Sequence, residues 1–182
     1  MVEKEIALEG LILIKPKIFT DRRGEFFESY NTDRMNNVIG GKTIFFQDNI
    51  SVSKKNVLRG LHFQRSPMAQ AKLIQVFRGG ILDVVVDLRL NSATYGKHFK
   101  VELNDQNRLQ LWIPQGFAHG FLTLEDNTIF SYKCTSAYSK KHEMNLLWND
   151  PMLNIDWGQT SPLLSDKDQL AQPFENFDSP FK

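Results

Sequence analysis

The stretch Val57-Leu58-Arg59-Gly60-Leu61-His62-Phe63-Gln64 places a guanidinium, a glycine and an imidazole within four residues inside an apolar run. Its large apolar residues are typical of a β-strand. Strict alternation would put Arg59 and His62 on opposite faces, whereas a bulge or a close backbone approach at Gly60 would turn both toward one cavity. The alternative is an edge strand with two solvated polar side chains.

The rest of the chain predicts short strands separated by turns. We expect them at residues 6–14, 25–30 (half-buried), 43–51, 72–78, 81–88, 96–103, 108–113 and 128–135. The glycine pair at 79–80 and the polar residues 104–107 predict two hairpins. Helices are expected at 32–39, ended by Gly40-Gly41, and at 164–171. Many short strands with little helix predict an all-β fold, a jelly-roll β-sandwich with a few short helices.

Composition narrows the function classes. The 182 residues carry a net charge of +1, which predicts neither a nucleic-acid partner nor a membrane surface as partner. No glycine-rich dinucleotide or P-loop motif is present. The single cysteine, Cys134, and the lack of an apolar leader predict a cytoplasmic protein with one domain over residues 1–182 and a tail from about residue 172. Fourteen Phe, four Tyr and three Trp favour an oligomer.

Residues with acid–base chemistry recur in the predicted strands. Histidine beside a carboxylate is a general base near neutral pH, tyrosine can act as a general acid, and a lysine can stabilise an enolate. A metal site is the rival interpretation, because Pro114-x-Gly116-x-x-His119 resembles the second half of a cupin metal motif. Gln64 stands where that motif needs a second histidine, and two histidines rarely hold a catalytic metal. No metal and no cofactor are therefore predicted.

Two aspartates have specific sequence contexts. In residues 81–88 the alternation puts Asp83 on the face opposite to Leu82 and Val84, which indicates that it lies in a cavity. Asp168 follows Ser165 by three residues, as in a capping box with Asp in place of Glu. Capping a helix and orienting a histidine are both open for Asp168 at this stage.

Several motifs together closely resemble the dTDP-4-dehydrorhamnose 3,5-epimerase family, over about residues 8–171. They are Gln47-Asp48-Asn49, Leu58-Arg59-Gly60-Leu61-His62-Phe63-Gln64, Lys72, Trp112-Ile113-Pro114-x-Gly116-Phe117-Ala118-His119-Gly120-Phe121 and Leu147-Trp148-Asn149-Asp150. The resemblance implies a metal-free cupin jelly roll, usually a dimer, that inverts C3 and C5 of dTDP-4-keto-6-deoxyglucose in dTDP-L-rhamnose biosynthesis.

The same resemblance implies roles for individual residues. His62 is expected to be the base, Asp168 to orient it, Tyr132 to be the acid and Lys72 to stabilise the enolate. The residues expected to bind the nucleotide sugar are Arg23, Glu28, Gln47, Asp48, Asn49, Arg59, His119, Tyr138, Glu143 and Lys167, with Tyr138 stacking on thymine. A single-carbon epimerase for a related 4-keto nucleotide sugar, a metal-dependent cupin and a non-catalytic binding module are the alternatives. Phe174, Phe177 and Phe181 of the tail are expected to pack on the body.

Overall fold

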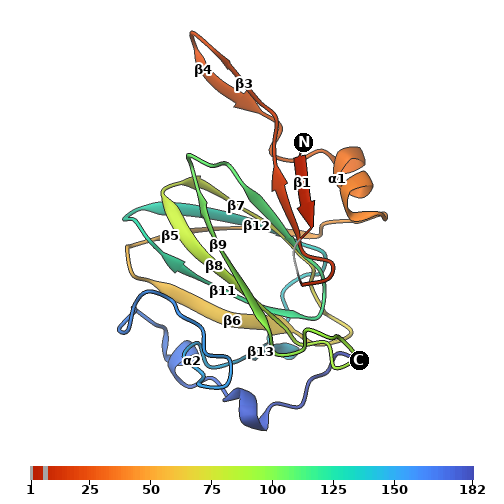
Figure 1. Ribbon diagram of the computed structural model, residues 1–182, viewed down its shortest axis with the longest axis vertical. Helices are drawn as coiled ribbons and strands as arrows, with labels where there is room; N and C mark the ends of the chain where they lie inside the picture. The colour runs from red at the N-terminus through yellow and green to blue at the C-terminus, as the bar shows by residue number, and fades with distance from the viewer. Residues whose placement is uncertain (1, 6–7) are drawn as a thin grey trace.

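The computed structural model describes residues 2–5 and 8–182, and most of its regular secondary structure is β-strand (Figure 1). In chain order the elements are β1 (Val2–Glu5), β2 (Ile12–Lys15), β3 (Ile18–Asp21), β4 (Gly24–Phe27), α1 (Thr32–Ile39), β5 (Gln47–Ser53), β6 (Leu58–Gln64), β7 (Lys72–Arg78), β8 (Gly80–Asp87), β9 (His98–Asn104), β10 (Gln110–Ile113), β11 (Phe117–Thr123), β12 (Thr128–Cys134), β13 (Glu143–Asn145), α2 (Asp166–Gln169) and a 3-10 turn (Phe174–Asn176).

Two antiparallel sheets face each other. One has the strand order β1-β2-β10-β7-β12-β5 and the other the order β13-β6-β11-β8-β9. From β5 to β13 the chain crosses between the two sheets at every step except β8 to β9. Repeated crossing between two sheets is the connectivity of a jelly roll, so the predicted all-β, cupin-type sandwich is confirmed.

Both predicted hairpins are wrong for the same reason. The strands at 72–78 and 81–88 are β7 and β8, and those at 96–103 and 108–113 are β9 and β10. In each case the two strands belong to different sheets. The glycine pair makes a corner between the sheets: Gly79 has φ +74°, and a Cβ on it would lie 2.4 Å from Thr128 Oγ1. A turn motif alone does not distinguish such a corner from a hairpin.

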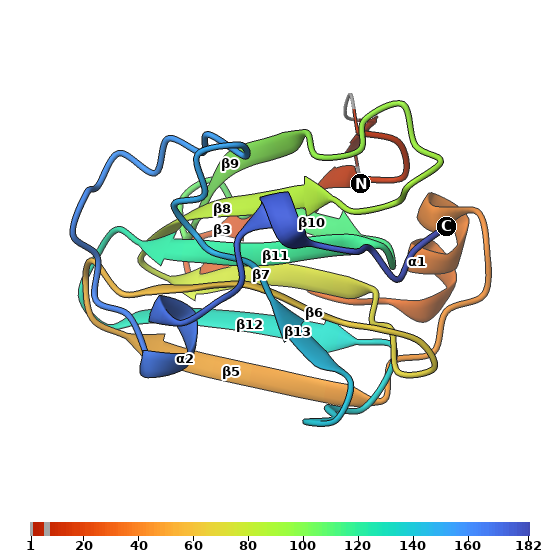
Figure 2. The ribbon, with the colours of Figure 1, turned by 90° about the horizontal axis from the view of Figure 1, so that it is seen from below.

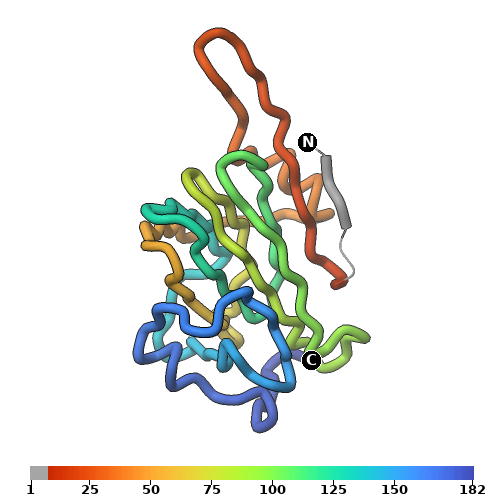
Figure 3. The backbone as a smooth tube through the Cα atoms, turned by 60° about the vertical axis from the view of Figure 1, so that its left-hand side comes forward, coloured from red at the N-terminus to blue at the C-terminus, as the bar shows by residue number. Residues whose placement is uncertain are grey.

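The N-terminal third differs most from expectation. The single strand predicted at 6–14 is interrupted by a turn at residues 8–10, and β2 begins only at Ile12; residues 6–7 lie outside the described part. The predicted half-buried strand at 25–30 is instead the exposed β4, which pairs with β3 alone. This hairpin projects from the body of the protein (Figures 1 and 3). Its Phe19 and Phe26 are 52% and 68% exposed, so their apolar character does not report burial within the chain.

The helices and β5 show smaller shifts. The helix at 32–39 is confirmed as α1, with Asn31 as its N-cap and Gly40 in the left-handed conformation at its end. The second helix spans only Asp166–Gln169, and β5 begins four residues later than expected. None of the helices described is long and apolar enough to cross a membrane.

Apolar side chains form three layers around the two sheets. The space between the sheets holds one cluster that includes Ile74, Val85 and Phe130. The outer face of the five-stranded sheet is covered by residues 146–182, including Trp148 and Phe177, as the view from below shows (Figure 2). The tail phenylalanines pack on this body as expected: the rings of Phe177 and Phe181 lie 5.6 and 5.9 Å from that of Phe63. A third cluster joins α1 to the outer face of the other sheet.

Candidate active site

A backbone contact between two glycines shapes β6 as the sequence predicts. A Cβ on Gly60 would lie 2.4 Å from Gly120 Cα of β11, so no larger residue fits there. Arg59 of β6 pairs with Phe121 of β11, and His62 pairs with His119. An advance of three residues along β6 therefore faces an advance of only two along β11. The extra residue is a bulge, and it turns Arg59 and His62 toward the same cavity. The predicted bulge is confirmed.

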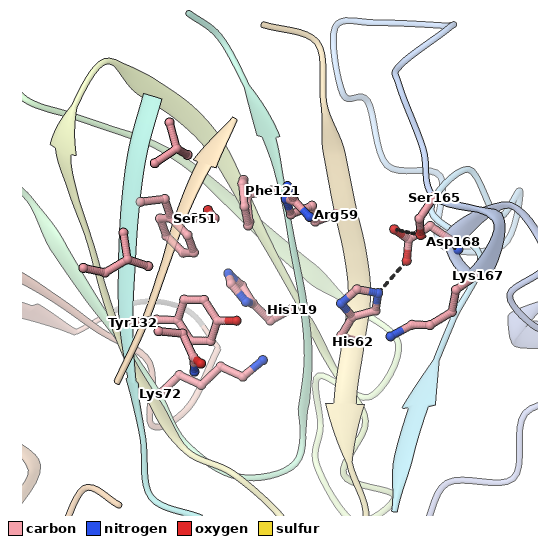
Figure 4. A pocket seen from close by; sticks show the side chains of 14 residues that line it. Ser51, Arg59, His62, Lys72, His119, Phe121, Tyr132, Ser165, Lys167 and Asp168 are labelled. Atoms are coloured by element: carbon pink, nitrogen blue, oxygen red, sulfur yellow. Dashed lines mark hydrogen bonds and ion pairs between the residues drawn. The ribbon is translucent and has the colours of Figure 1, made fainter. Parts of the chain in front are cut away.

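The cavity has a volume of about 590 Å³ and lies between the two sheets. A neighbouring cavity of about 290 Å³ shares four of its lining residues, namely Asn49, His62, Lys72 and Tyr132. Figure 4 shows His62, Asp168 and Ser165 on one side and Tyr132 with Lys72 on the other, with His119 and Arg59 between them. A flat molecule bound there would have an imidazole and a phenol near its two faces.

His62 is oriented by Asp168. Its Nε2 lies 2.5 Å from Asp168 Oδ1, and the Ser165 hydroxyl donates to the other carboxylate oxygen at 2.8 Å. Burial alone would raise the pKa of Asp168, but the hydrogen bonds with His62 and Ser165 lower it below its usual value. Because Asp168 occupies Nε2, Nδ1 is the nitrogen left to take a proton from a ligand. Ser165 also accepts a hydrogen bond from the Asp168 backbone, so Ser165 caps α2 and at the same time holds the carboxylate that orients His62. The return bond of a capping box, from the Ser165 backbone to the Asp168 carboxylate, is not formed among the described residues.

Tyr132 and Lys72 lie on adjacent strands of the opposite sheet, β12 and β7. Burial raises the pKa of Tyr132, which keeps the phenol protonated at neutral pH. Lys72 is almost fully buried, and this burial lowers its pKa; Asp83 and Glu143 act in the opposite direction. A protonated phenol and a partly desolvated ammonium are suited to donating a proton and to stabilising an oxyanion, respectively.

His119 forms a second histidine–carboxylate pair deeper in the cavity. Its Nε2 lies 2.7 Å from Asp83 Oδ2. Burial lowers the pKa of His119 although Asp83 opposes this effect, so the imidazole is neutral at pH 7. His119 and His62 are directly paired residues of β11 and β6. Asp83 faces inward and is fully buried, as the alternation predicts, but it is not among the residues that line the cavity.

Polar side chains line the rim next to the smaller cavity. Gln47 donates to Asn49 at 2.8 Å and accepts from the Tyr138 backbone, so the predicted shared face of Gln47 and Asn49 is confirmed. The Tyr138 hydroxyl donates to Glu143, which also binds Lys167 at 2.5 Å. Tyr138 is 54% exposed, which leaves ring surface open for stacking. The rim therefore offers amide, cationic and aromatic groups.

Three of the residues expected to bind the nucleotide sugar lie away from this cavity within the one chain described. Arg23 is at the tip of the β3–β4 hairpin and pairs with Asp21. Glu28 pairs with Arg34 of α1. Asp48 faces outward from β5 and binds Lys133 at 2.7 Å, opposite in direction to its neighbours Gln47 and Asn49.

The side chain of Gln64 supports loops. Its amide donates to the Met68 and Ala137 carbonyls and accepts from the Ser139 backbone. In the described part of the chain no three His, Cys, Asp or Glu side chains could hold a metal ion. Phe121 and Phe130 line the cavity although no sequence signal distinguished them from core aromatics.

A jelly roll whose cavity holds a carboxylate-supported histidine opposite a phenol, with a buried lysine nearby, belongs to the class of acid–base enzymes that move protons at carbon. The family model described as dTDP-4-dehydrorhamnose 3,5-epimerase matches residues 5–176. The chain belongs to this family, and it is an enzyme with the family's epimerase activity, which serves rhamnose biosynthesis.

Individual relatives support the same family assignment. The dTDP-4-dehydrorhamnose 3,5-epimerase of Salmonella typhimurium is 48% identical over 172 residues, which are 94% of each chain. The crystal structure of the enzyme of that name from Elizabethkingia anophelis has a TM-score of 0.92 at 44% identity, covering 97% of both chains. A dTDP-6-deoxy-D-glucose-3,5-epimerase from Legionella pneumophila, solved in complex with dTDP-4-keto-L-rhamnose, has a TM-score of 0.93 at 42% identity, covering 97% of this chain and 94% of that one.

Proposed function

We propose that the chain converts dTDP-4-dehydro-6-deoxy-D-glucose to dTDP-4-dehydro-L-rhamnose with His62 as base and Tyr132 as acid. The observation that carries this proposal is their placement on opposite sheets, across one cavity. Inversion needs proton removal from one face of the sugar and proton delivery to the other. Two groups on the same wall could not do both.

Each inversion is a pair of proton transfers. His62 Nδ1 takes the proton on C3 or C5. The C–H electron pair forms a double bond from that carbon to C4, and the π electrons of the C4 carbonyl move to its oxygen, which gives an enolate. Tyr132 then gives its phenolic proton to the same carbon from the opposite face. The C4 carbonyl re-forms, His62 releases its proton to solvent, and the Tyr132 phenolate takes one back. Asp168 stabilises the imidazolium formed in the first step.

Lys72 stabilises the oxyanion in both inversions. C3 and C5 are both adjacent to the C4 ketone, so either deprotonation places charge on the same oxygen. One fixed ammonium therefore serves both steps. Its buried position strengthens the interaction, because the attraction between charges is larger where water is excluded.

The nucleotide part of the substrate is held by the rim. Arg59 and Lys167 offer cationic donors for a diphosphate, and Tyr138 offers an exposed ring for thymine. Gln47, Asn49 and Glu143 supply the neighbouring hydrogen-bonding groups. We propose no metal and no cofactor. We also propose one domain over residues 1–182 and, because the one cysteine is unpaired and buried, a reducing cytoplasmic setting.

A homodimer would explain the residues that lie away from the cavity. The β3–β4 hairpin projects from the body and exposes Phe19, Phe26 and Arg23, whose side chain is 84% exposed although it pairs with Asp21. Exposed aromatic residues on a projecting element favour contact with another chain. We place this hairpin against the cavity of a second copy, where Arg23 and Glu28 would reach the nucleotide.

Mixing two inactive variants tests the dimer. His62→Asn chains retain an intact hairpin, and Arg23→Ala chains retain an intact cavity. After subunit exchange about half of the dimers are mixed, each with one complete site, so about a quarter of the sites should recover. Arg22→Ala, in the same turn, is the matched control and should remain active alone. No recovery after demonstrated exchange would contradict a shared site.

The product spectrum tests the reaction itself. Incubation with dTDP-4-keto-6-deoxyglucose, followed by proton NMR of the product after reduction of the ketone, should show coupling constants for inversion at both C3 and C5. Inversion at one carbon alone would identify a single-carbon epimerase instead. Tight binding without any change in the sugar would identify a binding module.

A further inference from the structure

The cavity contains two histidine–aspartate pairs of similar geometry. Nε2 of His62 meets Asp168, and Nε2 of His119 meets Asp83. The two histidines are directly opposite each other on β6 and β11. In both, Nδ1 forms no hydrogen bond with any described residue, and both rings line the cavity. The second pair is therefore arranged to present a ring nitrogen to a ligand, as the first one is.

Asp83 has an unsatisfied oxygen. Its side chain is 0% exposed, one oxygen binds His119, and Oδ1 has no hydrogen-bond partner within the described residues. Buried polar atoms are almost always paired, and a carboxylate oxygen left alone is destabilising. A pair that served only to hold two strands together would not need this uncompensated atom.

We propose that Asp83 is a positioning residue for the epimerisation, which holds His119 as the Nε2–H tautomer with Nδ1 open to a substrate hydroxyl. Asp83 itself touches no substrate. The inference rests on the proposed epimerisation of a sugar in this cavity.

The tautomer can be read directly in the wild-type protein. Nitrogen-15 NMR of the ligand-free protein at pH 7 should show His119 with a protonated Nε2 and an unprotonated Nδ1. The signal is assigned by its loss in His119→Asn, since the chain has only four histidines. A protonated Nδ1 with a bare Nε2 would overturn the assignment.

A matched pair of variants tests the effect on the reaction. Asp83→Asn should lower kcat/KM by about tenfold, as expected for the loss of one hydrogen bond to the substrate. It should also shift the His119 nitrogen signals away from the Nε2–H tautomer, because an Asn in place of the carboxylate no longer fixes that tautomer. Asp87→Asn removes another fully buried carboxylate of β8, bonded to Arg89, Ser92 and Thr94 instead, and should leave the His119 tautomer unchanged.

Retention of the Nε2–H tautomer together with an unchanged kcat/KM in Asp83→Asn would overturn the inference, while the roles of His62 and Tyr132 would stand because isotope exchange tests them separately. If Asp83→Asn does not fold, the nitrogen spectrum of the wild-type protein decides alone, and a protonated Nδ1 in His119 would overturn the inference.

Discussion

Oδ1 of Asp168 lies 2.5 Å from Nε2 of His62, although 106 residues separate the two in the chain. The four-residue helix α2 holds the carboxylate in place through its N-cap, Ser165. Lys167 of the same helix bonds through its carbonyl to Asn145 of β13, and β13 pairs with β6, the strand of His62. Ser165 thus links the cap of α2 to the orientation of His62, and substitutions at Ser165 and Asp168 can separate the two functions.

Asp168→Asn should reduce turnover by roughly 100-fold, because His62 loses the charge that stabilises its protonated form. The melting temperature should change by only a few degrees, since Asn is nearly isosteric. Ser165→Ala is the control for the cap: it should lower the free energy of unfolding by about 1 kcal/mol and reduce turnover less. Loss of stability with normal turnover in Asp168→Asn would leave only the capping role.

Gly60→Ala tests the contact that creates the bulge. Gly60 has φ +142° and no room for a Cβ beside Gly120. Gly24 is a matched control because its φ is +122° but nothing lies within 4 Å. Gly24→Ala should destabilise by about 1 kcal/mol from backbone strain alone. Gly60→Ala should destabilise clearly more in urea denaturation and abolish activity; equal losses would mean that the β6–β11 contact is unimportant.

Acid should weaken the fold through Asp87. Three side chains and one backbone group donate to this carboxylate, and despite the opposing effect of burial they lower its pKa from 3.8 to about 2. A carboxyl group whose pKa is lower in the folded protein stabilises the fold at any pH above its pKa in the unfolded chain. That contribution is lost as the pH falls through the pKa of the folded state. The difference in unfolding free energy between wild type and Asp87→Asn should therefore shrink from pH 4 to pH 2. A constant difference would contradict the lowered pKa.

Activity should survive exhaustive chelation. Gln64 occupies the position of a cupin metal ligand, and its amide is committed to three loop backbone groups. Dialysis against EDTA with metal analysis of the protein should leave turnover unchanged. Loss of activity that iron or zinc restores would favour the metal-dependent alternative.

Local sequence signals predicted the candidate site more accurately than they predicted how the strands are connected. Gly60 between Arg59 and His62 predicted the bulge, and alternation placed Asp83 inside. The corner at Gly79 was misread as a hairpin, because which sheet a strand joins depends on contacts between residues distant in sequence. The exposed strand β4 was misread as half-buried because Phe26 is apolar. Roles for Tyr132 and Lys72 came from family resemblance, since neither residue stands in a distinctive local pattern.

Solvent exchange in deuterium oxide tests the opposed base and acid most directly. The wild-type enzyme should place deuterium at both C3 and C5, because Tyr132 delivers a solvent-derived proton. Tyr132→Phe should still permit exchange by His62 but without productive inversion at the carbon that needs the phenol. His62→Asn, once shown to fold and to bind dTDP, should exchange at neither carbon. Wild-type exchange rates in that variant would show that His62 is not the base.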